Sequence, residues 1–353
     1  MNPSTPPPTL RQLDPLASHQ EVYAGSRRLA VIDMGSNSFR LIVVDYVPGL
    51  RFKVTDEVRE AVRLSEGMAE TSIMRAGAMD RALRAARIYR AFCEASGIDD
   101  IITVGTSAIR EARNREAFLR RVEAESQLRL RVLSGEEEAY YGYLAAVNST
   151  TLQNGFVLDL GGGSLEITQV AERQIHQSAS LTLGAVRVTE EFLPEMPASP
   201  RDIKELRTHL RNQFESLPWF RAQSGEMLVG EGGTLRLAAR LAQKMSGYPL
   251  DELHGYSLSV DQVEAVVEKL IPMRLRDRVA LAGMKEDRAD ISLGGALVVL
   301  EAMRSAGFEQ MTISSQGMRE GIFYERFLGS EHSAPLFALL LGYTVFLVLQ
   351  SRR

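Results

Sequence analysis

Short apolar runs alternate with longer stretches of helical periodicity along most of the chain. Apolar runs of three to six residues that are bounded by turn residues predict buried strands. The runs at 29–32, 39–44, 101–104, 156–158 and 165–170 have this form, and 128–133 alternates apolar and basic residues as a half-exposed strand does. Apolar positions spaced three and four apart predict helices at 75–95, 109–127 and 202–214. Strands that alternate with helices are typical of α/β proteins.

Polar and proline-rich stretches divide the chain. Residues 1–27 hold five prolines and little apolar periodicity, so we expect a disordered lead-in, with order beginning near Leu29. The polar segment NSTTLQN at 148–154 is the best candidate for a domain boundary. It separates an expected domain at 28–147 from a second domain at 148–329, and residues 330–353 form a hydrophobic tail.

Composition narrows the class of protein. With 353 residues, 45% hydrophobic and 24% charged, the chain has the size and apolar content of two globular domains. A net charge of −4 gives no overall attraction to nucleic acid, so no nucleic-acid partner is expected. A single cysteine, Cys93, excludes an intrachain disulfide and a thiolate metal cluster, and it lies on the apolar face of the helix predicted at 75–95. A reducing cytoplasm fits this composition.

The most informative feature is an internal repeat. DMGSNSFR, from Asp33 to Arg40, aligns with DLGGGSLE, from Asp159 to Glu166. In both copies a buried strand ends in Asp-x-Gly, small residues and a serine follow, and a second strand begins. Small residues allow backbone N–H groups to approach an anion closely and to form a phosphate nest. Neither copy is a P-loop or a dinucleotide fingerprint, since no Gly-Lys follows and the loop leads into a strand.

Two Asp-x-Gly hairpins, one in each expected domain, resemble those of the actin-like ATPase and sugar-kinase superfamily. Within it, the chain is similar to the exopolyphosphatase/guanosine pentaphosphate phosphohydrolase family over about 29–328. Beyond the two hairpins, the matching segments are GTSAIREA at 105–112, SGEEEA at 134–139, LGAVR at 183–187, GEGGT at 230–234, RAD at 288–290 and REG at 319–321. The resemblance implies two ribonuclease H-like domains with the active site in the cleft between them.

The resemblance also implies roles for individual residues. The two loops would bind phosphates through Gly35, Ser36, Asn37 and Ser38 and through Gly161, Gly162, Gly163 and Ser164. Asp159 and Glu166, with Asp33 as the counterpart of Asp159, would help to hold Mg²⁺, which needs few carboxylates because it retains waters. Arg110 would contact phosphate; its alternative is a helix-surface arginine. Gly232, Gly233 and Thr234 would contact a phosphate chain or a nucleotide, or only form a turn.

Three consecutive glutamates compete for the role of catalytic base. Glu137 stands three residues after Ser134, which predicts a structural capping box. Glu136 suits the positive end of the helix dipole in the first turn. Glu138 is rotated about 100° onward and can face a cleft, and the family's catalytic glutamate falls on this position. The basic run Arg113, Arg115, Arg120, Arg121, Arg129 and Arg131 is interpreted as a solvated face, with a cationic groove as the alternative.

The expected activity is therefore Mg²⁺-dependent release of terminal phosphate from inorganic polyphosphate. The alternatives are removal of the 5′-phosphate of guanosine pentaphosphate, a phosphate or nucleotide sensor without turnover, and an ATP-dependent kinase or ATPase. The sensor hypothesis rests on Gln316, because relatives usually have Ser-Asp-Gly where this chain has Ser315-Gln316-Gly317. The length also leaves no room for the additional C-terminal domains of longer relatives, which argues against strong processivity. A homodimer is expected.

The C-terminal tail carries no charge from Ser333 to Ser351. Nineteen such residues approach the length needed to cross a bilayer core of about 30 Å. Arg352 and Arg353 disfavour a simple tail anchor because spanning would place both outside the cytoplasm. The sequence favours a short or interfacial membrane attachment of cytoplasmic catalytic domains; packing on protein is the alternative.

Overall fold

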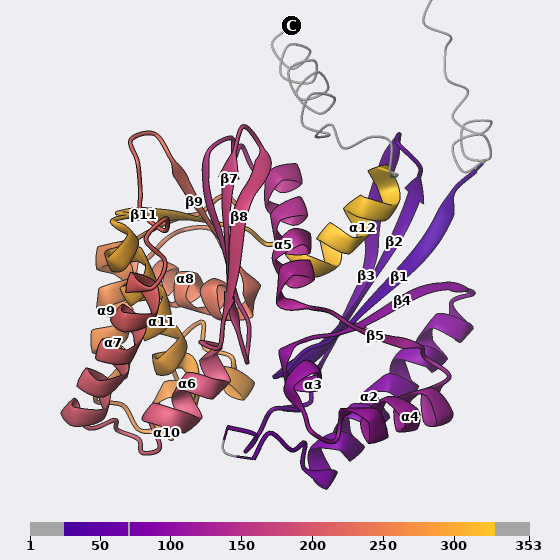
Figure 1. Cartoon of the computed structure of the whole chain (residues 1–353), viewed down its shortest axis with the longest axis horizontal. Helices are drawn as coiled ribbons and strands as arrows, with labels where there is room; N and C mark the ends of the chain where they lie inside the picture. The colour runs from indigo at the N-terminus through magenta and orange to yellow at the C-terminus, as the bar shows by residue number, and fades with distance from the viewer. Residues whose placement is uncertain (1–24, 70, 329–353) are drawn as a thin grey trace, which may run out of the picture.

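The computed structural model describes residues 25–69 and 71–328, whose strands form two mixed sheets (Figure 1). The first sheet has the order β3-β2-β1-β4-β5 and the second the order β10-β11-β9-β6-β7-β8. The first strands are β1 (Arg27–Met34), β2 (Ser38–Val47), β3 (Arg51–Ala61), β4 (Asp100–Gly105) and β5 (Leu130–Val132). The later strands are β6 (Gly155–Leu160), β7 (Leu165–Ala171), β8 (Gln174–Leu181), β9 (Met227–Glu231), β10 (Ser257–Ser259) and β11 (Gln310–Ile313).

The two sheets repeat one topology. In each, a hairpin and a third antiparallel strand are extended by two parallel strands, because β1 pairs in parallel with β4, and β6 with β9. The second sheet adds only β10, antiparallel to β11. The fold class expected from the sequence, α/β with two related domains, is confirmed by this duplication.

Helices cover both faces of the first sheet. Alternate residues of a strand point to opposite faces, and in β1 Ala30 and Ile32 pack in one core while Leu29 and Val31 pack in another. The first core is closed by α2 (Ala76–Ala95), α3 (Ser107–Glu111) and α4 (Arg115–Ser126). Cys93 on α2 is fully buried there, as predicted.

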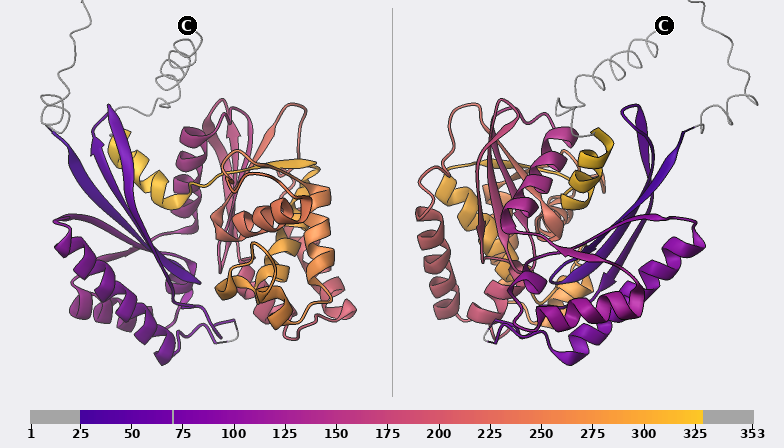
Figure 2. Two further views of the ribbon diagram at one scale, coloured as in Figure 1. Left: turned by 180° about the vertical axis from the view of Figure 1, so that it is seen from behind. Right: turned by 45° about the vertical axis from the view of Figure 1, so that its right-hand side comes forward.

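The other face of the first sheet is covered by α5 (Gly135–Ser149) and α12 (Met318–Leu328). The last described helix thus follows the second sheet in the chain but packs on the first, beside α5 (Figure 2). The two helices approach closely at Gly321, where a Cβ would lie 1.8 Å from the carbonyl oxygen of Tyr141. The proposed boundary at 148–154 overlaps the last two residues of α5 and then forms the connection to β6.

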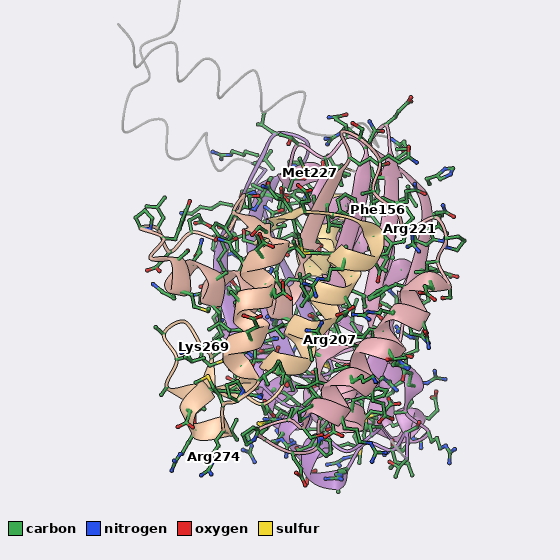
Figure 3. The ribbon with its side chains drawn as sticks, turned by 90° about the vertical axis from the view of Figure 1, so that its left-hand side faces the viewer. Phe156, Arg207, Arg221, Met227, Lys269 and Arg274 are labelled. Atoms are coloured by element: carbon green, nitrogen blue, oxygen red, sulfur yellow. The ribbon has the colours of Figure 1, made fainter. Side chains whose placement is uncertain are left out.

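The second sheet carries α6 (Ala185–Phe192), α7 (Pro200–Glu215), α8 (Gly232–Ser246), α9 (Val260–Leu270), α10 (Leu275–Val279) and α11 (Ser292–Ala306), with a 3₁₀ turn at Glu286–Arg288. Figure 3 views this half of the molecule from its outer side, with Arg207 of α7 labelled. Arg207 and Arg211 both donate to the carboxylate of buried Glu301 on α11, which fixes α7 on α11.

The predicted strands and helices are present with three differences. β1 begins at Arg27, two residues before the expected start. The single helix predicted at 109–127 is wrong, because Ala112 is extended and the Asn114 amide bonds to the backbone of Met74, which separates α3 from α4. The outer strands β3 and β8 were not predicted, since most of their side chains are partly or fully exposed and lack an apolar run.

Most of the lead-in and the whole tail at 330–353, including the proposed membrane contact at 333–351, lie outside the described residues. Within 25–69 and 71–328, no helix has the length and apolar character needed to cross a membrane.

Candidate functional site

A cavity lies between the two sheets, where the repeated hairpin loops meet. Its walls include most of the residues that the sequence singled out: Asp33, Gly35, Ser36, Asn37, Ser38, Glu138, Asp159, Gly161, Gly162, Ser164, Glu166, Gly232 and Gly233. Residues from 33 to 320 therefore converge on one space, as the interdomain cleft required.

The two loops face each other at close range. A Cβ on Gly162 would lie 3.1 Å from Cβ of Ser36 and 3.3 Å from the backbone nitrogen of Asn37. Ser36 Oγ lies 3.0 Å from Ser107 Oγ and accepts from the backbone N–H of Ala108, so the first loop is tied to the start of α3. A side chain at Gly162 would press on the opposing loop, which would have to give by a few tenths of an ångström.

Strand register sets the charged pairs beside the loops. In the first hairpin Asp33 is opposite Arg40, and in the second Asp159 is opposite Glu166. Parallel pairing of β6 with β9 also places Glu231 next to Asp159. The duplicated hairpin therefore carries a cation in one copy where the other has a second carboxylate.

The first turn of α5 separates the three glutamates. Ser134 Oγ accepts from the N–H of Glu137, and the Glu137 carboxylate accepts from the N–H of Ser134, which is the predicted capping box. Glu136 is exposed, whereas Glu138 is 8% exposed and lines the cavity. Of the three, only Glu138 faces the site.

Arg110 lies behind Glu138 and not among the residues that line the cavity. Its guanidinium donates to the Glu138 carboxylate and, at 2.9 Å, to the carbonyl of Leu133. Gly163 and Thr234 are likewise not among the lining residues: a Cβ on Gly163 would lie 2.5 Å from Ser107 Oγ, and Thr234 is buried beneath the cavity edge near Arg288. Arg115, Arg121, Arg129 and Arg131 form ion pairs with nearby carboxylates, as on a solvated face.

Burial and mutual repulsion raise the pKa of the acidic groups. Burial raises the pKa of Asp33 to about 6, against the attraction of Arg319 and Arg40. Burial and the charge of Asp159 raise the pKa of Glu166 to about 7, and burial together with Glu166 raises that of Glu138 well above its usual range. Ionising all of these carboxyl groups together is therefore costly in free energy unless a cation lies close to them.

Four arginines line the same cavity, and the sequence reasoning assigned none of them a role: Arg40, Arg236, Arg288 and Arg319. Arg319 donates to Glu57 on β3. Burial and the other three guanidiniums hold the pKa of Arg40 well below its usual range. The repeat and the matching segments contained Arg40, Arg288 and Arg319, but no motif indicated Arg236. Cations that crowd together in this way are typical of an anion site.

A further carboxylate, that of Glu231, lies near position 316 and was not predicted from the sequence. Gln316 Oε1 accepts a 2.7 Å hydrogen bond from the Tyr324 hydroxyl and does not line the cavity. Glu231 is fully buried, neither of its carboxylate oxygens has a hydrogen-bond partner in the described structure, and a Cβ on Gly317 would lie 3.8 Å from it. An acidic group therefore stands close to the element in which Gln316 replaces aspartate.

A magnesium ion fits these residues on the condition that a phosphate group supplies further ligands. In the part of the chain that the structure describes, no three His, Cys, Asp or Glu side chains gather as a metal-binding group. Mg²⁺ is often held by one or two carboxylates together with substrate phosphates and waters. Asp33 Oδ1 is buried without a partner, and both Asp33 and Asp159 line the cavity. The residues fit an ion that arrives with a phosphate ligand.

The chain is similar to known proteins over most of its length. The chain is 30% identical to Exopolyphosphatase 1 of Mycobacterium tuberculosis over 306 residues, which cover 85% of this chain and 88% of the relative. It is 32% identical to Exopolyphosphatase 2 of the same organism, with 84% and 97% covered.

Solved structures show the same fold. A Ppx/GppA family member from Aquifex aeolicus superposes with a TM-score of 0.72 at 26% identity, over 87% of this chain and 100% of the other. An exopolyphosphatase from Cytophaga hutchinsonii gives 0.79 at 24% identity, over 85% and 98%. The sequence model of the Ppx/GppA phosphatase family matches residues 42–329. The chain belongs to the Ppx/GppA phosphatase family.

Proposed function

We propose that the chain hydrolyses the terminal phosphoanhydride bond of inorganic polyphosphate and releases orthophosphate. The observation that carries the proposal is the position of Glu138, a buried carboxylate on the wall of a cavity that also holds two facing glycine loops and four arginines. Phosphoryl transfer requires neutralisation of the phosphoryl oxygens and a positioned water, and this cavity offers groups for both.

The glycine loops would bind the terminal phosphates. Gly35–Ser38 of the first loop and Gly161, Gly162 and Ser164 of the second all line the cavity, where their backbone N–H groups would bind phosphate oxygens. The guanidiniums of Arg40, Arg288 and Arg319 would neutralise the oxygens of the chain, since charge-assisted hydrogen bonds to phosphate are the strong ones.

Glu138 would accept a proton from the attacking water. The water oxygen forms a bond to the terminal phosphorus as the bridging P–O bond breaks, and the shortened chain leaves on the bridging oxygen. The ion pair with Arg110 favours the ionised form of Glu138 against burial and the charge of Glu166. Arg110 is thus proposed as a positioning residue for the base and not as a phosphate contact.

Mg²⁺ would be held by Asp159 and Asp33 together with substrate phosphates, where it would neutralise developing charge. Glu166 accepts a 2.8 Å hydrogen bond from Ser180, which orients its carboxylate beside Asp159 in the hairpin. Glu166 would thus lie beside the carboxylate that is proposed to hold the metal.

Phosphate release tests the proposal with a matched pair of variants. Wild type, Glu138→Gln and Glu136→Gln are incubated with Mg²⁺ and polyphosphate, guanosine pentaphosphate or ATP, and orthophosphate is measured. Glu138→Gln should lower kcat by about 100-fold or more, the range for loss of a general base. Glu136→Gln removes the same charge from the same turn, at an exposed position, and should retain full activity.

Three results would count against the proposal. Release of phosphate from guanosine pentaphosphate but not from polyphosphate would show that the nucleotide is the substrate. Binding without release under any divalent metal would make the protein a sensor. Full activity of Glu138→Gln would show that Glu138 is not the general base.

A further inference from the structure

A second, strongly cationic hollow adjoins the cavity. It is lined by Arg40, Gly233, Arg236, Leu237, Arg240, Lys285 and Arg288. Arg40, Gly233, Arg236 and Arg288 border both hollows, so the two are continuous. Arg240 and Lys285 belong only to the second, and the Lys285 side chain is exposed at its mouth.

The five cations of this hollow form no ion pair in the described structure, although the charge of Asp33 acts on Arg40 and that of Asp159 on Arg236. None of Arg40, Arg236, Arg240, Lys285 and Arg288 forms an ion pair among residues 25–69 and 71–328, whereas most other arginines near the cavity do. The nearest carboxylates of the same segment are engaged elsewhere, because Asp287 pairs with Arg59 and Asp290 with Arg63. Glu286, beside Lys285, is exposed.

The cations are also held close together. A Cβ on Gly233 would lie 2.5 Å from a guanidinium nitrogen of Arg288 and 2.8 Å from one of Arg40, so both groups rest on the first turn of α8. Partial burial and the charges of Arg59, Arg240, Arg40 and Arg288 lower the pKa of Lys285 to about 8. Unpaired cations at such range are stabilised by a bound polyanion.

The chemistry of the walls selects the kind of anion. Among the described residues, no aromatic side chain lines either hollow, and Asn37 supplies the only side-chain amide. A nucleobase would find no ring to stack on and few groups to read its edges. Repeated cations along a groove match a repeated anion instead.

We propose that Arg240 and Lys285 form a distal subsite for inorganic polyphosphate, which binds the phosphates of the chain that lie beyond the cleaved end. The chain runs from the glycine loops past Arg40 and Arg288 to the mouth at Lys285. This inference rests on the proposed function for the cleaved end and adds a preference for linear chains longer than the cavity can hold. The subsite would also favour polyphosphate over guanosine pentaphosphate, because the base of the nucleotide gains no contact there.

Equilibrium binding tests the subsite in the Glu138→Gln background, in which substrate persists. The double variant Arg240→Gln/Lys285→Gln should weaken binding of long-chain polyphosphate about tenfold, the effect of losing charge-assisted contacts. Binding of tripolyphosphate, which fits within the cavity, should change by less than about twofold. Lys244→Gln/Arg276→Gln is the matched control: it removes the same charge from two exposed, ion-paired positions of the same half of the molecule and should leave both affinities unchanged.

Equal weakening for both probes, no weakening for either, or no binding of polyphosphate would overturn the subsite. The subsite would also be overturned if the double variant lost as much affinity for guanosine pentaphosphate as for long polyphosphate. The nucleotide is expected not to reach Lys285, so its affinity should not change in this way. Failure of the proposed function is distinct: wild-type protein would then release no phosphate, although the length-dependent difference in affinity would still be measurable.

Discussion

At the scale of single residues, the environment of Glu138 decides what the site can do. Sequence neighbours Glu136, Glu137 and Glu138 are chemically alike, yet one is in solvent, one caps a helix and one lines the cavity. Burial and Glu166 raise the pKa of Glu138, and Arg110 lowers it. A base in this position is active only above its pKa, so Arg110 widens the pH range of activity.

Arg110→Gln should therefore move the acidic limb of the kcat/KM–pH profile to higher pH. Removing the cation leaves burial and Glu166 unopposed, and the loss of a close opposite charge is worth roughly one pH unit or more. Arg110→Lys keeps the charge and should restore most of the profile. Arg129→Gln, at an exposed arginine paired with Glu123, is the control and should not move the limb. A lower rate with an unmoved limb would instead indicate that Arg110 acts on substrate phosphate.

At the scale of elements, one helix start positions the carboxylate that is proposed as the base. The capping box at Ser134 fixes the first turn of α5, and Glu138 is in that turn. The chain contains the same box at Ser259, at the start of α9, and the residues of α9 are not among those lining the cavity. The two boxes have the same local chemistry and different consequences.

Ser134→Ala and Ser259→Ala should each lower the free energy of unfolding by about 1 kcal/mol, the usual cost of losing a cap. Denaturant unfolding followed by circular dichroism measures this. Only Ser134→Ala should also lower kcat, because the turn that carries Glu138 loses its anchor. If both variants lost activity in proportion to stability, the cap would have no separate role in catalysis.

At the scale of the whole molecule, two copies of one sheet topology meet at the cavity, and α12 returns from the end of the second half to cover the first sheet. Tyr141 on α5 donates to Glu325 on α12 and accepts from Arg131, so the two helices are joined by hydrogen bonds as well as by packing. Arg187 on α6 and Glu111, the last residue of α3, form an ion pair between the two halves.

Gly321→Ala tests how closely α5 and α12 must pack. The new Cβ would lie 1.8 Å from the backbone carbonyl of Tyr141, which cannot move aside as a side chain could. Overpacking of this kind costs about 1–3 kcal/mol, so the thermal midpoint should fall clearly. Gly77→Ala on α2 has open space, with its nearest neighbour at 3.9 Å, and should be neutral or slightly stabilising. Equal midpoints for the two variants would contradict the close contact.

The sequence by itself determined the repeated hairpin, the central strands and the Ser134 capping box, because each depends on local periodicity or spacing. The choice of Glu138 among three glutamates rested on the resemblance to the family as well as on its position in the helix. Only the tertiary structure decided the outer strands β3 and β8, whose side chains are stabilised by pairing with a neighbouring strand and not by an apolar run. It also decided the placement of Arg110 behind Glu138, the gathering of Arg236, Arg240 and Lys285, and the burial of Glu231. These depend on which residues distant in the chain share one space, and no local pattern specifies that.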